Sequence, residues 1–196
     1  MKSDKVKQVV IPAVALLLIC LITTALLGFT DKLTREPIAR ENALTAQRSR
    51  EEVCPAAADF EQIDIDLQGT NAEVHRGLDS DGNTVGFAVA TSAHGYGGDI
   101  KVMTGIDCDG VVIGINVYDN SGETPGLGAN TSTQKFMSQY SGVEADKGFV
   151  VSKNASKEPD KHPVDAVTGA TISSNAVTYA VNEAIDIYNN YCREGK

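Results

Sequence analysis

The sequence has few of the side chains from which metal and iron–sulfur centres are built. It contains no tryptophan, three histidines and four cysteines. His75, His94 and His162 are scattered, and no pair of them has the spacing of metal ligands. No C-x-x-C pair occurs, so we predict no metal site. The cysteine spacing leaves open one disulfide or none among the residues beyond the amino-terminal region: Cys54, Cys108 and Cys192.

Basic residues are scarce in the larger part of the chain. Residues 1–52 carry 8 Lys/Arg and 6 Asp/Glu, whereas residues 53–196 carry 9 and 20, so charges of +2 and −11 give the total of −9. A nucleic-acid partner requires a basic face, so we exclude nucleic acid. Solubility is a sufficient explanation of the acidic surface.

One long hydrophobic run lies near the amino terminus. Residues 9–29, VVIPAVALLLICLITTALLGF, contain no charge, and as a helix they span roughly the 30 Å of a bilayer core. The lysines in residues 1–8 favour a cytoplasmic amino terminus in a cell membrane, with an extracytoplasmic main domain. A cleaved signal peptide is the alternative, but the run is long and no small-x-small cleavage site follows it. We expect an uncleaved transmembrane helix in the lipid bilayer, and a helical stalk over residues 30–52.

Short β-type runs follow the stalk. Residues 72–78, 84–92, 100–107 and 111–118 combine β-branched or aromatic residues with partial alternation, and turns such as SDGN at 80–83 separate them. This pattern predicts an antiparallel meander.

Helices are expected mainly after these strands. We predict a helix over 132–140 capped by Thr131 or Ser132, a short strand near 148–152, and a helix from Thr171 to about Cys192. Strands followed by segregated helices predict an α+β domain over residues 53–196. The apolar face expected to pack on the sheet consists of Ile172, Ala176, Ala180, Ala184, Ile187 and Tyr191.

The stretch 165–177, DAVTGATISSNAV, places a hydroxyl group where a loop becomes a helix. Gly169 permits a turn, and Thr171 follows at the helix start. The first amides of a helix lack partners and carry the positive end of its dipole, so they favour a phosphate. Two more hydroxyls follow in the first turn, those of Ser173 and Ser174. The alternative interpretation is that Thr168 or Thr171 only caps the helix.

Two glycine-rich stretches precede this one. Residues 123–128 read ETPGLG, which allows close approach of a ligand, and residues 94–100 read HGYGGDI. Each is by itself compatible with an ordinary turn. Tyr96 is either a stacking residue or an ordinary tyrosine at the end of a strand.

The three stretches resemble the signatures of the FMN-binding domain found in the G subunit of the Rnf complex and in the C subunit of the sodium-pumping NADH:quinone oxidoreductase. ETPGLG matches the second signature at all six positions, and GYGG matches a third, with Asp99 where Pro is common. The single anchor and the chain length fit the Rnf branch better. The flavinylation motif, which precedes a helix, is matched by Asp165, Thr168, Gly169, Ala170, Thr171 and Ser173.

The resemblance implies FMN esterified through its phosphate to Thr171. It also implies a separate flavin transferase, which moves FMN from FAD with a divalent metal, and partners among the other subunits of an Rnf ion-translocating ferredoxin:NAD+ oxidoreductase. The chain would be an electron-relay subunit and not an enzyme by itself. The expected flavin shell consists of Tyr96, Glu123, Thr124, Gly126, Leu127, Gly128, Lys135, Thr168, Gly169, Ala170, Ser173 and Ser174.

Other classes of function remain open on the sequence alone. An anchored interaction module without redox chemistry would use the TGAT turn only as a helix start. The C subunit of a sodium-pumping quinone oxidoreductase, or a lone flavinylated carrier, would keep the flavin, although no lipobox cysteine and no second catalytic domain is evident. A single anchor provides no ion pathway, so any ion coupling belongs to partner subunits.

Overall fold

The computed structural model describes residues 2–65 and 72–193, with side chains described from residue 8 onward. The lysine side chains on which the expected orientation of segment 1–8 depends therefore lie outside the described residues. The chain forms two compact units, residues 1–44 and 45–196.

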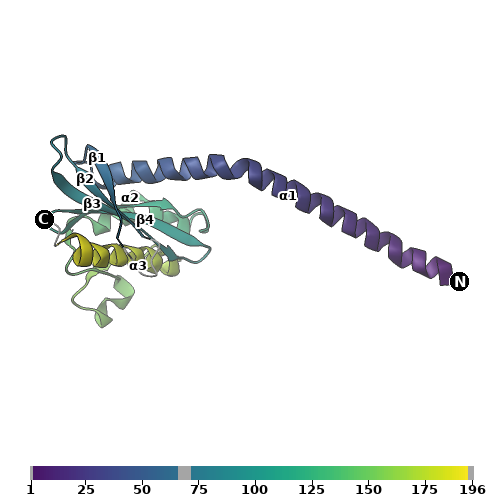
Figure 1. Cartoon of the computed structure of the whole chain (residues 1–196). Coiled ribbons are helices and arrows are strands. Elements are labelled where there is room, and N and C mark those ends of the chain that lie inside the picture. Colours follow the sequence, from purple (N-terminus) through teal and green to yellow (C-terminus); the bar gives the residue numbers. More distant parts are fainter. Residues whose placement is uncertain (1, 66–71, 194–196) are drawn as a thin grey trace. The chain divides into compact units, whose positions relative to one another are not determined.

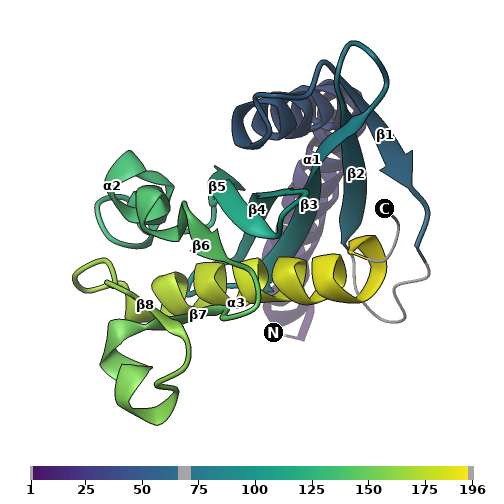
Figure 2. The same ribbon diagram turned by 90° about the vertical axis from the view of Figure 1, so that its left-hand side faces the viewer.

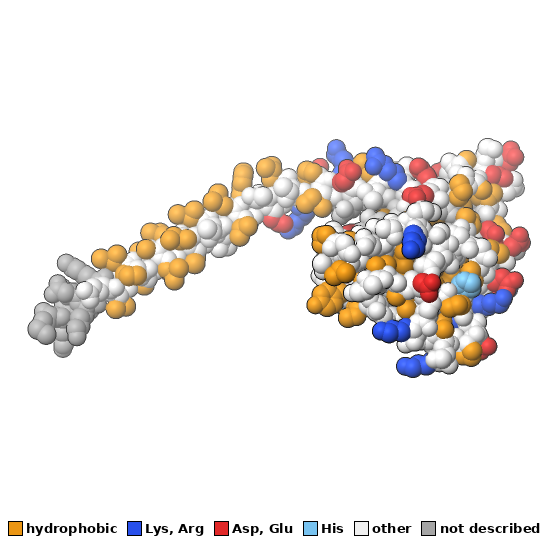
Figure 3. Space-filling view, turned by 180° about the vertical axis from the view of Figure 1, so that it is seen from behind, with side chains coloured by type: hydrophobic (Ala, Val, Ile, Leu, Met, Phe, Trp, Pro, Cys, Tyr) orange, Lys and Arg blue, Asp and Glu red, His pale blue; other side chains and the backbone are white. Residues whose placement is uncertain are grey.

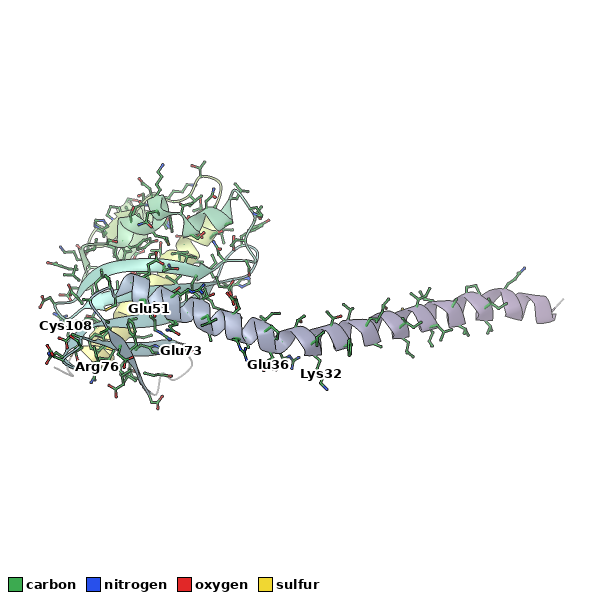
Figure 4. The ribbon with its side chains drawn as sticks, turned by 90° about the horizontal axis from the view of Figure 1, so that it is seen from above. Lys32, Glu36, Glu51, Glu73, Arg76 and Cys108 are labelled. Atoms are coloured by element: carbon green, nitrogen blue, oxygen red, sulfur yellow. The ribbon has the colours of Figure 1, made fainter. Side chains whose placement is uncertain are left out.

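The first unit is part of one continuous helix, α1 (Lys2–Val53), which contains Pro12 and Pro37 (Figure 1). The predicted apolar run and stalk are consecutive parts of this helix. One stretch is long and apolar enough to cross a membrane, with a mean hydropathy of 2.8, and none of it is buried. Hydrophobic side chains cover the visible surface of this stretch in Figure 3, and charged residues such as Lys32 and Glu36 follow it (Figure 4).

The second unit is built on an antiparallel sheet whose strands lie side by side in chain order. The four predicted strands are confirmed. Two short strands at its edges, DFEQI and VE, were not predicted because neither has a marked apolar alternation. The strands of the described part are β1 (Asp59–Ile63), β2 (Glu73–Leu78), β3 (Thr84–His94), β4 (Asp99–Asp107), β5 (Val111–Asp119) and β6 (Val143–Glu144).

The segment after β5 is less regular than expected. The predicted helix over 132–140 is reduced to α2 (Gln134–Met137) between two 3-10 turns, Gly128–Ser132 and Ser138–Tyr140. Capping by Thr131 or Ser132 is wrong, because α2 starts after Thr133 without a side-chain cap and the Thr131 hydroxyl donates to the Gly128 carbonyl. The strand near 148–152 is β7 (Phe149–Val151), which pairs in parallel with β8 (His162–Val164) across a 3-10 segment, Ser152–Lys157.

The long helix α3 (Thr171–Ile187), continued by a π turn over Tyr188–Cys192, crosses one face of the sheet (Figure 2). The expectation that Ile172 and Tyr191 belong to its buried face is wrong, because they are 56% and 51% exposed. The buried face also includes larger residues such as Val177, Val181 and Tyr188. The other four predicted residues are confirmed as buried: Ala176, Ala180, Ala184 and Ile187.

The opposite face of the sheet receives the last turns of α1. Val53 packs with Ala88, Ala90 and Met103. A side chain at Gly105 would overlap the Val53 carbonyl, so glycine there permits close approach of the helix end. The sheet is thus covered on both faces, and the α+β fold class is confirmed.

Candidate functional site

Three loops meet at the amino-terminal end of α3. They are the loop between β3 and β4, the loop after β5, and the turn that leads into α3. They enclose a cavity of about 430 Å³, which brings all three predicted motifs together. Its lining consists of Tyr96, Glu123, Thr124, Leu127, Gly128, Gly169, Ala170, Thr171, Ile172 and Ser173.

The start of α3 has no side-chain cap. The N-cap position is occupied by Ala170, and no side chain bonds to the first amides. The alternative that Thr168 or Thr171 caps the helix is therefore wrong. The amides of Thr171, Ile172 and Ser173 donate no hydrogen bond to any of the described residues. A helix start of this kind offers several donors and a positive dipole end to an anion.

Hydrogen bonds to the Ser174 hydroxyl hold the turn before α3. The buried Ser174 hydroxyl donates to the Ala170 carbonyl at 2.9 Å and accepts the Val167 amide at 3.0 Å. Gly169 adopts a φ of 78°, which a residue with a side chain adopts only with strain. These constraints place half-buried Thr171 beside the cavity.

Asp165 fixes the beginning of the same turn. Its carboxylate accepts the Ser152 hydroxyl at 2.8 Å, and its amide donates to the side chain of Gln139 at 2.8 Å. The Gln139 amide group donates in return to the Asp165 carbonyl at 3.2 Å. Asp165 does not line the cavity, so its contacts are those of a residue that holds the loop.

Glu123 connects the walls of the cavity. One carboxylate oxygen accepts the amides of Tyr96 at 2.7 Å and Gly97 at 3.1 Å, and the other accepts the Ser173 hydroxyl at 2.6 Å. The side chain is only 5% exposed. A Cβ atom at Gly95 or Gly128 would overlap this carboxylate, so the backbone closes around it on two sides.

These contacts set the ionisation of Glu123. Burial acts to raise the pKa of its carboxyl group, but the hydrogen bonds from Ser173, Gly97 and Tyr96, with the nearby His94, outweigh burial. The pKa therefore lies below its usual value of 4.5. Glu123 is a carboxylate at neutral pH.

The rim of the cavity is apolar and exposed. Tyr96 is 70% exposed, Leu127 44% and Ile172 56%. Ile172 was assigned to the core by its helical spacing, and only its place directly after the TGAT turn was a signal of a different role. Uncovered apolar side chains grouped beside a cavity indicate a binding surface.

Some of the expected shell lies apart from the cavity lining. Ser174 is buried beneath the turn, and Thr168 is exposed on it. Gly126 shapes its loop with a φ of 79°, and its carbonyl accepts the Asn130 side chain. Lys135 is exposed on α2.

A larger cavity of about 700 Å³ lies along α3 and shares Ile172 with the first. Its lining comes from α3, from the end of β3, from β7 and from the segment between β7 and β8. It includes neither Thr171 nor any residue of the ETPGLG loop, so we place the candidate site in the smaller cavity.

The arrangement at Thr171 fits a phosphate that carries an apolar group. The unpaired amides and the hydroxyl offer hydrogen-bonding groups to the phosphate, and the exposed rim offers apolar contact. No basic side chain lines the cavity, so the helix start is the main source of positive potential there.

Comparison with known proteins gives consistent matches. Residues 95–186 match the FMN-binding domain family, and residues 1–53 match the RnfG N-terminal region. The chain also resembles the C subunit of the Na+-translocating NADH-quinone reductase from Parabacteroides distasonis, with a TM-score of 0.51, 21% identity, and 66% of this chain and 71% of that chain covered. That likeness concerns the fold alone.

Two relatives match along most of their length. The G subunit of the Na+-translocating ferredoxin:NAD+ oxidoreductase complex of Acetobacterium woodii is 37% identical over 188 residues, with 89% of each chain covered. The G subunit of the ion-translocating oxidoreductase complex of Methanosarcina acetivorans is 34% identical, with 92% of this chain and 94% of the relative covered. The chain therefore belongs to the RnfG family, the G subunits of ion-translocating oxidoreductase complexes.

Proposed function

We propose that this chain is a membrane-anchored electron-transfer subunit of an Rnf-type ion-translocating ferredoxin:NAD+ oxidoreductase, and that it carries FMN joined through its phosphate to Thr171. The observation that carries the proposal is the cavity at the uncapped start of α3, where the Thr171 hydroxyl lies among three loops. The FMN-binding domain match and the RnfG relatives support it.

The residues around Thr171 have distinct tasks in this proposal. The amides of Thr171, Ile172 and Ser173 would hold the phosphate oxygens. In the attachment step the Thr171 Oγ1 would lose its proton and bond to the FMN phosphorus of FAD, while the pyrophosphate bond of FAD breaks and AMP leaves. Tyr96, Leu127 and Ile172 provide apolar surface beside the ester. The bound FMN would supply the electron-accepting and electron-donating chemistry, which no side chain of the cavity provides.

Covalent attachment suits a domain outside the cytoplasm, because a cofactor that dissociates there is lost. The exposed apolar part of α1 is proposed to lie in the lipid bilayer as a single span, with the amino terminus in the cytoplasm. A flavin transferase is the proposed partner during maturation, and the other complex subunits are the partners in electron transfer and ion movement. The chain is then a relay within the complex and does not act as an enzyme alone.

The Thr171 hydroxyl is the group to test. We expect Thr171→Ala to fold and to carry no covalent flavin, because no oxygen remains for the ester. Thr171→Ser is expected to retain some flavin. The measurement is flavin fluorescence of the band after denaturing electrophoresis, with chains produced together with a flavin transferase.

Thr133→Ala is the matched control, because it removes an exposed threonine hydroxyl that lies outside the three motifs and does not line the cavity. It is expected to keep its fluorescent band. Normal flavin in Thr171→Ala would contradict the site. A dark band from the unchanged chain would favour an anchored module without redox chemistry.

A further inference from the structure

Glu123 is the one buried carboxylate among the described residues. A buried charge is costly unless donors surround it. Glu123 lies in the loop after β5, and its three donors come from two other segments, the 95–98 loop and the first turn of α3. This burial is maintained only while the three segments keep their arrangement.

The Glu123 carboxylate links two walls of the cavity by hydrogen bonds. Its two oxygens face different segments, so it spans from the amides of Tyr96 and Gly97 to the hydroxyl of Ser173. Ser173 stands two residues after Thr171 on the same helical turn. The hydrogen bonds of Glu123 therefore fix the position of that turn, including its unpaired amides, relative to the 95–98 loop.

We propose that Glu123 is a positioning residue for flavin attachment. It holds the first turn of α3, and with it the Thr171 hydroxyl, against the 95–98 loop. It neither binds the cofactor nor accepts the Thr171 proton. An ionised carboxylate has no donor to offer a phosphate, and both its oxygens are already occupied by protein donors. This inference rests on the proposed function.

Glutamine separates positioning from proton transfer. In Glu123→Gln the amide oxygen accepts the Tyr96 and Gly97 amides, and the amide nitrogen donates to the Ser173 oxygen. The hydrogen bonds that join the 95–98 loop to α3 are kept, while the carboxylate that could accept a proton is lost. In Glu123→Ala all three donors lose their acceptor. The first variant is expected to restore attachment relative to the second.

The experiment measures the rate of covalent attachment on the full chain, with a flavin transferase, FAD and Mg²⁺. Denatured samples taken over time are assayed for flavin fluorescence. Glu123→Ala is expected to be slower by about ten- to hundredfold, and Glu123→Gln to stay within about threefold of the unchanged chain. Glu144→Ala, which removes an exposed carboxylate, is the matched control and is expected to react at the normal rate.

A second readout needs no flavin. Amide hydrogen exchange is compared for the same Glu123 variants in a Thr171→Ala chain. The Tyr96 and Gly97 amides are expected to exchange faster in Glu123→Ala and to be protected in Glu123→Gln, with β3 and β4 unchanged in both. Unchanged exchange at Tyr96 and Gly97 in Glu123→Ala would overturn the proposal that Glu123 holds the 95–98 loop against α3.

The outcomes separate this inference from the proposed function. Normal attachment in Glu123→Ala would overturn the positioning role and leave the flavin site intact. Equal loss in Glu123→Gln and Glu123→Ala would also overturn it, because the carboxylate itself would then be required. An unchanged chain that accepts no flavin would overturn the proposed function.

Discussion

Some glycines around Glu123 have no room for a side chain. The Gly128 position faces the Glu123 carboxylate and the Ser173 hydroxyl, which a Cβ atom would overlap. Gly98, in the neighbouring loop, would place a Cβ atom 3.4 Å from the Gly122 Cα, which is an ordinary contact distance. The two glycines differ in what surrounds them, although both lie in loops near the same cavity.

We expect Gly128→Ala to lower the free energy of unfolding by about 1–3 kcal/mol, because the added methyl group pushes the Glu123 carboxylate from its donors. Gly98→Ala is expected to stay within about 0.5 kcal/mol of the unchanged chain. Chemical denaturation of the full chain in detergent measures both. Equal stability of the two variants would contradict the crowding at Gly128.

The sequence predicts some of these residues and not others. Thr171 follows from a local pattern, a turn glycine and a helix start within a few positions. The contact between Glu123 and Ser173 joins residues 50 positions apart, and no local pattern specifies it. The ETPGLG motif predicts Glu123 beside the flavin. Its hydrogen bonds to the 95–98 loop and to Ser173 are known only from the structure.

At the scale of elements, the end of α1 meets the sheet at a buried histidine. Arg50 of α1 donates to Nε2 of His75 on β2 at 2.9 Å, so this nitrogen is unprotonated. Figure 4 labels Glu73 and Arg76, which lie on the same strand as His75. Burial lowers the pKa of His75 below its usual 6.5, Arg50 lowers it further, and Glu73 opposes them.

This pKa predicts a loss of stability in weak acid. The unfolded chain takes up the His75 proton more readily than the folded chain. The stabilising effect is therefore complete above the unfolded pKa of 6.5 and declines as pH falls below it toward the folded pKa. Denaturation midpoints of the full chain between about pH 5 and 7.5 should show this decline.

His75→Gln is the comparison, because glutamine keeps an acceptor for Arg50 and does not titrate. It is expected to flatten the pH dependence, while the exposed His94 and His162 are the same in both chains. The same slope in both chains would contradict the coupling between Arg50 and His75.

Element prediction succeeded where the periodicity was strong. β2 to β5 carry enough alternation to be located from sequence, and α3 was found by its helical spacing. β1 and β6 are short and form through pairing with a neighbour, which local sequence does not encode. α2 is short because the chain before it turns tightly from Gly128 to Ser132.

At the scale of the whole molecule, the chain combines an exposed apolar helix with a domain that presents one hydroxyl at an uncapped helix start. The family assignment accounts for both parts, since the RnfG N-terminal region and the FMN-binding domain match them in turn. A membrane location and a covalent cofactor are separate claims about the same chain. One sample tests them together.

That sample is the carbonate-washed membrane fraction of cells that produce the complex, digested with trypsin and analysed by mass spectrometry. The account predicts that the chain stays in this fraction and that the peptide covering residues 162–193 carries the mass of FMN less one water, with fragment ions that place it on Thr171. An unmodified peptide from membranes in which other proteins carry covalent flavin would contradict the account.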